Sequence, residues 1–396
     1  MDDEATPFLV VGGGIGGMVL ALALARRGQR SLVLEQAPEI GEIGAGIQLA
    51  PNGLRVLDRL GVFQALLATA VAPPAATLRD ATSGEVLARL TFDDRFRGEY
   101  GYPYLVIHRS DLHSGLVDAA LATGLVEIRT NSRVAGLRQD PAGPAEVALA
   151  TGERLRAQRV VGADGLHSVV REYVSGGDDL VHLGDFAYRG TVPYDEIADR
   201  EGKDDVTWWV GPSMHLIQYP VRGGSLINQV AVFTSDADRP DLGAPADPAD
   251  FDRLLDGKHP LVAQGAALLD RQRHWAMIDR NPLGRWTRGR VTLLGDAAHP
   301  MVQYLAQGGC QALEDAACLA ECVASNDDAE SAFKDYESRR IPVTATVQRW
   351  ARNMGAIVHA GGLMRDLRDE LLRSRTTDSF PHVDRLYGNH ATEART

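Results

Sequence analysis

The 396-residue chain has few cysteines, no excess of basic residues and no long apolar run. Its formal charge of −12 argues against a nucleic-acid partner, because neutralising phosphates requires a basic surface. The first residues, Met-Asp-Asp-Glu, are acidic where a signal peptide is basic. The longest apolar run near them, Met18 to Ala25, is far below the roughly 20 residues that span a bilayer. We therefore expect a soluble, cytoplasmic protein with no integral membrane segment.

The cysteine pattern excludes further classes of protein. Cys310, Cys318 and Cys322 fall on one predicted helix, and no Cys/His quartet has zinc spacing, so we expect small core residues and no metal site. The stretch after Glu35 lacks Cys-x4-Cys, which disfavours a flavin–dithiol disulfide reductase. A second G-x-G-x-x-G is also absent, which argues against a second permanent dinucleotide domain.

What is present near the start is an apolar strand, a glycine turn and an Ala/Leu-rich helix. Gly12, Gly14 and Gly17 satisfy G-x-G-x-x-G. Gly12 allows the tight turn, Gly14 lets the backbone approach a pyrophosphate, and Gly17 lets the helix pack close to the strand. A second strand ends at Glu35, 23 residues after Gly12, where a carboxylate accepts hydrogen bonds from ribose hydroxyls. The pattern favours an adenine dinucleotide without a 2′-phosphate over a merely glycine-rich loop.

Two later segments look like parts of the same site. Residues 159–171 contain Val-Val-Gly-Ala-Asp-Gly, and residues 290–300 contain Leu-Leu-Gly-Asp-Ala-Ala-His-Pro, followed by Gly308-Gly309 and a helix. Each segment is a buried-type strand that ends in aspartate and glycine. In this order the three motifs resemble the dinucleotide, "DG" and "GD" motifs of the class A flavoprotein aromatic hydroxylases, and the resemblance covers nearly the whole chain.

The resemblance and the strand patterns together predict an α/β fold. We expect a doubly wound, Rossmann-like FAD-binding domain, an interleaved antiparallel β-sheet substrate domain and C-terminal helices. The predicted FAD-binding domain comprises residues 1–75, 97–180 and 276–342, the substrate domain residues 76–96 and 181–275, and the C-terminal helical segment and tail residues 343–396. We also expect a helix break near Pro342 and an irregular tail beyond Arg375.

The resemblance implies FAD as the bound cofactor and NADH or NADPH as a transient reductant. The helix after Gly308-Gly309 would present its positive N-terminus to the N1–C2=O edge of the flavin. Asp296 would hold the ribityl or ribose side, and Pro300 would line the reactive face. The predicted cofactor-binding residues are Gly12, Gly14, Ile15, Gly17, Glu35, Gly46, Gln48, Arg109, Asp164, Gly295, Asp296, Pro300, Gly308 and Gly309.

Two of these residues have structural alternatives. Arg109 matches the family's flavin-contacting arginine, but an arginine at this place can also form a surface ion pair. Asp164 would touch both the flavin and the transiently bound nicotinamide cofactor. Its alternative is a purely structural turn aspartate.

The strand around residues 214–220 is the most informative about the substrate. A period of two places His215, Ile217 and Tyr219 on one face. A neutral histidine near pH 7 is suited to taking a phenol proton, directly or through Tyr219 or a water. The alternative is a core histidine, which a lone strand histidine usually is; the family resemblance favours the catalytic role.

Gln303 and Tyr304 stand where the commoner family pattern has proline and an aromatic residue. A polar amide there suggests a hydrogen bond to a polar substrate, and the chain is more similar to 3-hydroxybenzoate 6-hydroxylases than to other branches. The implied reaction uses O2 and a flavin C4a-hydroperoxide to hydroxylate an aromatic hydroxy acid para to its phenolate, giving 2,5-dihydroxybenzoate from 3-hydroxybenzoate. A decarboxylating salicylate hydroxylase, a flavin oxidase or dehydrogenase, and a non-catalytic flavin-binding regulator remain alternatives. The family's habit is a homodimer.

Overall fold

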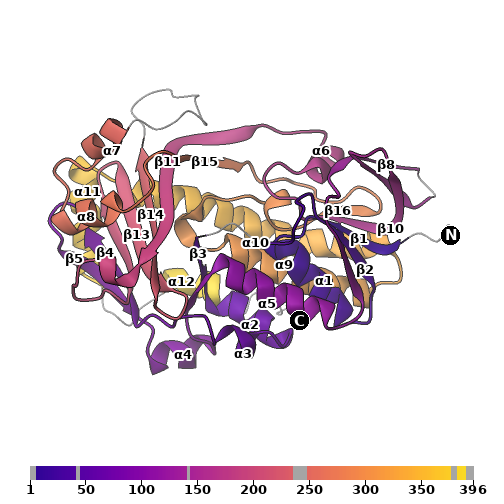
Figure 1. The fold of residues 1–396 in the computed structure, drawn as a ribbon, viewed down its shortest axis with the longest axis horizontal. Coiled ribbons are helices and arrows are strands. Elements are labelled where there is room, and N and C mark those ends of the chain that lie inside the picture. Colours follow the sequence, from indigo (N-terminus) through magenta and orange to yellow (C-terminus); the bar gives the residue numbers. More distant parts are fainter. Residues whose placement is uncertain (1–5, 42–44, 141–142, 235–247, 376–380, 389–396) are drawn as a thin grey trace.

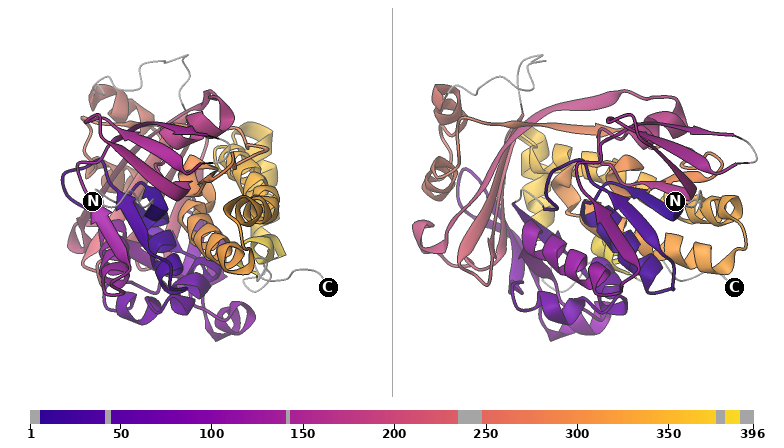
Figure 2. Two further views of the ribbon diagram at one scale, coloured as in Figure 1. Left: turned by 90° about the vertical axis from the view of Figure 1, so that its right-hand side faces the viewer. Right: turned by 45° about the vertical axis from the view of Figure 1, so that its right-hand side comes forward.

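The computed structural model describes residues 6–41, 45–140, 143–234, 248–375 and 381–388. Two β-sheets lie towards opposite ends of the molecule, and helices α9 (Gly308–Ser325) and α10 (Ala329–Val358) run along its middle (Figure 1). Strands β11 (Leu180–Pro193) and β15 (Trp275–Arg280) extend along one side between the two ends (Figures 1 and 2). Within the described residues, no helix is both long and apolar enough to cross a membrane.

The first sheet has the strand order β7–β2–β1–β10–β9–β8, and β16 also pairs with β10. Strands β7, β2, β1, β10 and β16 are parallel, whereas β8 and β9 form an antiparallel hairpin beside β10. The strands are β1 (Thr6–Val11), β2 (Ser31–Leu34), β7 (Val126–Arg129), β8 (Val134–Gln139), β9 (Ala145–Leu149), β10 (Arg154–Gly162) and β16 (Val291–Leu293). This arrangement confirms the predicted α/β class with its parallel nucleotide-type sheet.

Helix α1 (Ile15–Ala25) connects β1 to β2 and lies between the sheet and two further helices. All of its residues except Gly16 are buried, which fits a sequence that is apolar on every face. It packs against α5 (Arg109–Leu121) and α9. The three cysteines lie on α9 and are buried, as expected of small core residues.

The second sheet has the order β15–β11–β14–β13–β12–β4–β5 and is antiparallel except where β12 pairs with β4. Its other strands are β4 (Ala75–Asp80), β5 (Val86–Thr91), β12 (Val206–Gly211), β13 (Met214–Val221) and β14 (Leu226–Thr234). Met214 and Leu216 share a core with α7 (Pro248–Leu254) and α8 (Pro260–Ala267) on one face. Ile217 and Tyr219 pack on the other face, so the predicted alternation is confirmed.

Strands β3 (Gly46–Leu49) and β6 (Leu105–His108) form a third, two-stranded sheet. Each of the two strands lies in a segment of the chain that runs from one of the larger sheets to the other. The smaller helices lie in the remaining segments. They are α2 (Pro51–Arg59), α3 (Phe63–Leu66), α4 (Asp94–Tyr100), α6 (Val169–Ser175), α11 (Gly362–Arg373) and α12 (Pro381–Tyr387).

The structure corrects two expectations and bears on one predicted boundary. Residues 276–280 pair with β11 in the second sheet, whereas the last predicted FAD-binding segment begins at residue 276. Helix α10 continues through Pro342, because buried side chains such as Tyr336 and Val347 hold both of its halves against the core. The tail contains helix α12, whose Tyr387 packs against Tyr100 at 5.6 Å between ring centres. Residues 376–380 and 389–396 lie outside the described residues. The proposed division into domains stays a prediction.

Candidate active site

The three sequence motifs meet at one edge of the first sheet. The last residues of β1, β2, β10 and β16 lie side by side in register. Because these four strands are parallel, the residues that follow them come together at their carboxyl ends, where such sheets bind ligands. These residues include Gly12, Glu35, Asp164 and Gly295.

Two glycines of the first motif are required by close backbone contacts. Gly12 has a φ of +105°, and a Cβ there would lie 2.3 Å from the carbonyl oxygen of Ala163. A Cβ at Gly17 would lie 1.9 Å from the carbonyl oxygen of Gly12. The expected close approach of helix and strand is therefore confirmed. Gly14 is the N-cap residue of α1, and its contact with a pyrophosphate stays a prediction.

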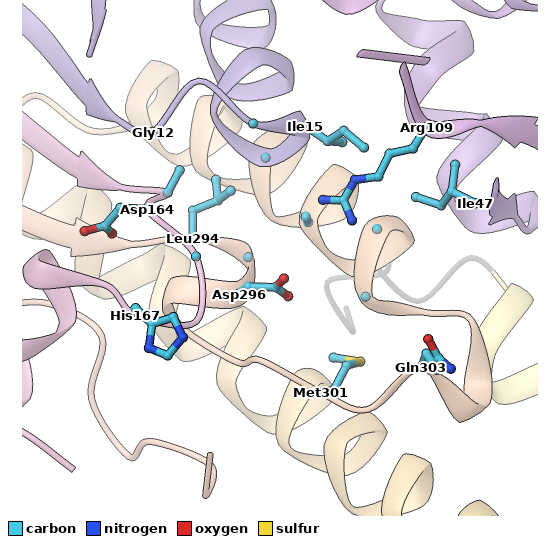
Figure 3. Close-up of a pocket in the computed structure, with 18 of the residues that line it drawn as sticks. Gly12, Ile15, Ile47, Arg109, Asp164, His167, Leu294, Asp296, Met301 and Gln303 are labelled. Carbon is cyan, nitrogen blue, oxygen red and sulfur yellow. The ribbon is translucent and has the colours of Figure 1, made fainter. Parts of the chain in front are cut away.

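A cavity of about 740 Å³ opens at this edge (Figure 3), and residues of the second sheet also border it. Its size is in the range of ordinary ligand sites. The predicted site residues that border it are Gly12, Gly14, Ile15, Glu35, Gly46, Gln48, Arg109, Asp164, Tyr219, Gly295, Asp296, Gln303, Gly308 and Gly309. The predicted residues Gly17, His215 and Pro300 do not border it. The site therefore brings together the cofactor motifs and part of the predicted substrate face.

The N-terminus of α9 borders the cavity and has no side-chain cap. The helix begins at Gly308, two residues earlier than we expected, and its N-cap Gln307 makes no capping hydrogen bond. Free N–H groups and the helix dipole favour a negatively charged group at this end. Figure 3 shows Arg109 and Asp296 pointing into the same space near this helix. These groups fit the polar edge of a flavin and the chain that carries its phosphates.

Glu35 borders the part of the cavity beside the glycine turn. Its carboxylate accepts hydrogen bonds from the backbone N–H of Gly13 at 2.9 Å and of Ala37 at 2.8 Å. A carboxylate has about four acceptor sites, so two are left for ribose hydroxyls. The two backbone bonds fix the carboxylate at the end of β2, where the sequence motif places it.

Asp164 combines a structural role with a place on the cavity wall. Its carboxylate accepts hydrogen bonds from the Ser168 hydroxyl and from the backbone N–H groups of Val169 and Val170, at the start of α6. Burial raises the pKa of this carboxyl despite these bonds. The structural alternative is thus present in the molecule, and a contact with flavin or nicotinamide is an additional role that stays a prediction.

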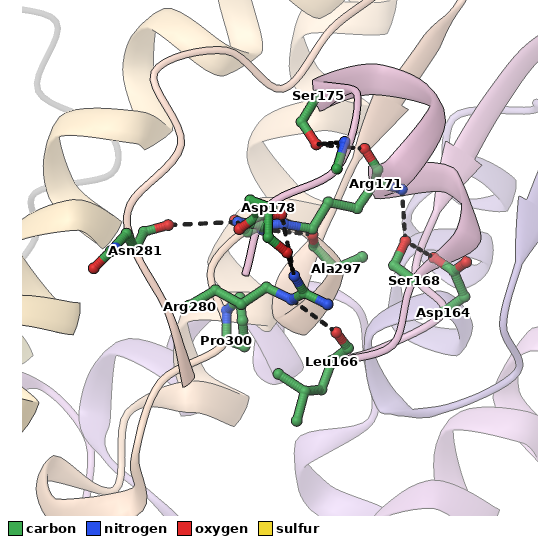
Figure 4. Close-up of polar contacts among 12 residues, drawn as sticks. Asp164, Leu166, Ser168, Arg171, Ser175, Asp178, Arg280, Asn281, Ala297 and Pro300 are labelled. Atoms are coloured by element: carbon green, nitrogen blue, oxygen red, sulfur yellow. Dashed lines mark hydrogen bonds and ion pairs between the residues drawn. The ribbon is translucent and has the colours of Figure 1, made fainter. Parts of the chain in front are cut away.

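A buried arginine joins the second motif to the third (Figure 4). The Arg171 guanidinium donates to the carbonyl oxygens of Ala297 and Ala298, at 3.0 and 2.7 Å. The same guanidinium pairs with Asp178, which Arg280 also contacts. Because Ala297 and Ala298 follow Asp296 directly, this clamp fixes the loop that carries Asp296 against the start of α6.

The first residue of β3, Gly46, lies directly against the second sheet. The backbone N–H of Gly46 donates to Asn228 Oδ1 at 2.7 Å, and a Cβ at Gly46 would lie 2.5 Å from Tyr219 Cε2. Tyr104 donates its hydroxyl to Gln48 Oε1 at 2.7 Å. These contacts place Gly46, Gln48 and Tyr219 on one wall of the cavity, and burial raises the pKa of the Tyr219 hydroxyl.

Gln303 and Tyr304 point to different partners although they are adjacent. Gln303 borders the cavity, and its Nε2 is buried with no hydrogen-bond partner among the described residues. Tyr304 donates its hydroxyl to Asp185 at 2.6 Å. An unpaired buried amide costs free energy unless a ligand accepts from it, so the Gln303 amide is suited to a polar substrate.

His215 lies on the predicted face but deeper than the cavity wall. It is fully buried, and its Nδ1 lies 2.7 Å from His359 Nε2. Its ring packs edge-on against Tyr304. Burial, followed by the charge of His359, lowers the pKa of His215 well below 6.5. Its Nε2 has no hydrogen-bond partner among the described residues, so one ring nitrogen is free to accept a proton.

Sequence reasoning missed several residues that border the cavity on the side of the second sheet. Arg189, Val230 and Trp275 contribute to this wall, and Met301 borders the cavity as well. The signal in the sequence was the charge of Arg189 within the alternating stretch 187–192. The face of the sheet to which the Arg189 side chain points depends on which strands pair with this stretch. The strand order is not evident from the sequence.

Comparisons with known proteins identify the family. The FAD binding domain family matches residues 5–351. The chain is 40% identical to 3-hydroxybenzoate 6-hydroxylase 1 of Aquipseudomonas alcaligenes over 97% of this chain and 98% of that one. It is 41% identical to 3-hydroxybenzoate 6-hydroxylase of Polaromonas naphthalenivorans (strain CJ2), over 96% of both chains.

A solved structure shows the same fold with the cofactor in place. Klebsiella pneumoniae HpxO complexed with FAD and uric acid is 26% identical, with a TM-score of 0.83, over 97% of this chain and 96% of that one. The cavity, its glycine cradle and its uncapped helix N-terminus fit such a dinucleotide. The chain belongs to the FAD-dependent aromatic monooxygenase family.

Proposed function

We propose that the protein hydroxylates 3-hydroxybenzoate at carbon 6, para to the phenol, and forms 2,5-dihydroxybenzoate with NADH and O2. The observation that carries this proposal is the continuity of one cavity from the dinucleotide motifs to Gln303, whose buried Nε2 has no hydrogen-bond partner among the described residues. The relatives at 40% identity, named for 3-hydroxybenzoate, support the choice of substrate. When bound, FAD would supply the redox chemistry, which is to take up the reducing equivalents of NADH and to activate O2.

The residues of the chain would then position the aromatic acid and manage its proton. Ile217, Val230 and Met301 offer apolar contacts to the ring, and the Gln303 amide donates to an oxygen of the substrate. Hydroxylation para to a phenol is favoured when the phenol is deprotonated, because the negative oxygen raises the electron density of the ring. The site therefore needs an acceptor for the phenol proton.

His215 is the proposed acceptor of that proton. Ile217, on the same strand face, borders the cavity, whereas His215 does not. The proton therefore reaches His215 Nε2 indirectly, through Tyr219 or a bridging water. A pKa well below 6.5 makes His215 neutral at pH 7, but also makes the imidazolium costly. We propose that His215 therefore passes a proton from Nδ1 to His359, which lies 3.8 Å from the carboxylate of Asp185.

Salicylate hydroxylase activity with decarboxylation is the second candidate function. A salicylate hydroxylase substrate complex has the same fold, with a TM-score of 0.77. Its 23% identity supports the fold alone. For the first candidate function we also propose that the protein forms a homodimer and that its reductant is NADH rather than NADPH.

A panel of hydroxybenzoates tests the proposal. NADH and NADPH oxidation and O2 uptake are measured with 2-, 3- and 4-hydroxybenzoate, together with hydrogen peroxide release. The proposal expects the highest coupled activity with 3-hydroxybenzoate and NADH. NADH oxidation that needs no aromatic compound would instead indicate a flavin oxidase or dehydrogenase.

A further inference from the structure

Arg189 belongs to the floor of the cavity. In the second sheet Arg189 lies opposite Val230, which lies opposite Ile217 on the next strand. Side chains of directly opposed residues point to the same face of a sheet. Val230 and Ile217 both border the cavity, and Arg189 borders it beside them. A cation therefore stands at one end of an otherwise apolar row.

The surroundings of Arg189 are positively charged. No carboxylate forms an ion pair with it within the part of the chain that the structure describes. Burial, then the charges of Arg109 and Arg273, lower the pKa of its guanidinium. Such an environment favours an anionic ligand.

Trp275 holds the guanidinium in place. The guanidinium carbon of Arg189 lies 4.6 Å from the centre of the Trp275 ring. Stacking on an aromatic face leaves the edge of a guanidinium free, and that edge matches a carboxylate with two parallel hydrogen bonds. Arg273 lies over the same ring at 5.1 Å but does not border the cavity. One arginine is thus oriented for a ligand and the other is not.

Arg189 and Gln303 also share a second, smaller cavity that adjoins the first. Both residues border both cavities, as do Trp275 and Met301. The junction therefore combines a cation, a free amide and apolar walls, which are the groups that an aromatic acid with a second polar substituent requires.

We propose that Arg189 binds the carboxylate of the aromatic substrate and makes the enzyme selective for aromatic acids over neutral phenols. This inference rests on the proposed function for the identity of the acid, but not for its charge. Trp275 acts as a positioning residue, because it orients the guanidinium without touching the carboxylate. The acid is held at Arg189, and its hydroxyl-bearing side is left for Gln303 and the proton acceptor.

The test compares an acid with its neutral amide. Dissociation constants for 3-hydroxybenzoate and 3-hydroxybenzamide are measured from changes in the flavin absorbance of the holoenzyme, without NADH. Arg189→Met should weaken binding of the acid by roughly 10- to 100-fold, the usual effect of losing a charge-assisted hydrogen bond to a ligand. Binding of the amide should change less than about 3-fold. Arg189→Lys should lie between, and the control Arg273→Met should leave both constants near those of the wild type.

Three results would overturn the inference. The first is an equal loss of acid and amide binding, which means that Arg189 only shapes the cavity. The second is wild-type binding of both the acid and the amide by Arg189→Met, which means that Arg189 does not contact the substrate. The third is loss of FAD from Arg189→Met, Arg189→Gln and Arg189→Lys alike, which means that Arg189 binds the cofactor.

The same comparison separates this inference from the proposed function. If 3-hydroxybenzoate does not bind, the titrations are repeated with 2- and 4-hydroxybenzoate and their amides. Dependence of either acid on Arg189 would retain the inference and reject only the proposed substrate. If no acid binds more tightly than its amide, the inference is wrong.

Discussion

His215 Nδ1 and His359 Nε2 lie 2.7 Å apart and join the second sheet to the end of α10. The contact continues on the far side of His359, whose Nδ1 lies 3.0 Å from the Thr234 hydroxyl and 3.8 Å from Asp185. Tyr304 donates to the same Asp185. His215 is therefore one end of a buried polar chain, which an isolated core histidine would not require.

The first prediction concerns the proton acceptor. His215→Ala should still bind FAD and be reduced by NADH, but hydroxylation should fall by roughly 10²- to 10⁴-fold, the usual contribution of a positioned general base. Oxygen uptake should then end as hydrogen peroxide. Raising the pH towards the pKa of the substrate phenol should partly restore hydroxylation, because solvent then supplies the phenolate. Normal hydroxylation at pH 7 would return His215 to a structural role.

Two matched variants test whether the loss of hydroxylation comes from the buried polar chain or from the removal of any histidine near the sheet. His359→Gln should reduce hydroxylation in the same direction as His215→Ala if the proton passes onward. His259 stacks on Trp209 on the other face of the sheet, and His259→Gln should leave coupling unchanged. The ratio of product formed to NADH consumed is the measurement that compares them.

The second prediction concerns stability at acid pH. The pKa values of His215 and His359 are both lowered in the folded protein, chiefly by burial, although Asp185 opposes the shift at His359. The unfolded chain therefore takes up protons first, so this contribution to stability is present above pH 6.5 and is lost as the pH falls below it. The free energy of unfolding should fall with pH in that range by up to about 1.4 kcal/mol per pH unit for each histidine.

The histidine variant gives the comparison for this slope. His215→Leu should show a smaller fall in the free energy of unfolding between pH 6.5 and 5.5 than the wild type, as measured by denaturant titration at each pH. Equal slopes in the two proteins would mean that other groups cause the acid sensitivity.

The third prediction concerns Gln303→Pro, which introduces the commoner family residue. Val302 has a φ of −66° and a ψ of 149°, the extended conformation that a following proline requires, and Gln303 begins a short 3-10 helix. The variant should therefore fold and retain FAD. It should change the preferred hydroxybenzoate or raise peroxide release, because the substrate loses a hydrogen-bond donor. Unchanged coupling and preference would show that the Gln303 amide does not contact the substrate.

The fourth prediction concerns the cofactor. The purified protein should be yellow and release FAD rather than FMN on denaturation. Glu35→Ala should weaken FAD binding by roughly 10- to 100-fold, as expected from lost charge-assisted hydrogen bonds to ribose. The exposed Glu39 offers the control, and Glu39→Ala should bind FAD normally. If both variants bound FAD with equal affinity, Glu35 would not contact the ribose.

The cofactor side of the site could be predicted from sequence because its determinants are local. A glycine turn such as Gly12–Gly17 carries its own steric reason, and parallel strands bring their carboxyl ends together whatever the rest of the fold. Glu35 and Asp296 could be placed in this way, since Glu35 directly follows β2 and Asp296 comes three residues after the end of β16. The same local logic predicted the alternation of His215, Ile217 and Tyr219.

The substrate side depends on contacts between distant segments. Arg189 faces the cavity because β11 pairs with β14, and His215 is removed from it because Tyr304 and His359 pack over its ring. Pro342 remains inside α10 because the packing of both halves outweighs one lost hydrogen bond. None of these relationships has a signature within a short stretch of sequence.

Identification of the product formed from 3-hydroxybenzoate tests the central claim most directly. The holoenzyme is supplied with 3-hydroxybenzoate, NADH and O2, and the product is identified by chromatography and mass spectrometry while NADH and O2 consumption are followed. The account predicts 2,5-dihydroxybenzoate with its carboxylate retained, in near-equal amount to the NADH consumed. Hydrogen peroxide without any hydroxylated product, or efficient conversion only of salicylate to catechol and carbon dioxide, would contradict it.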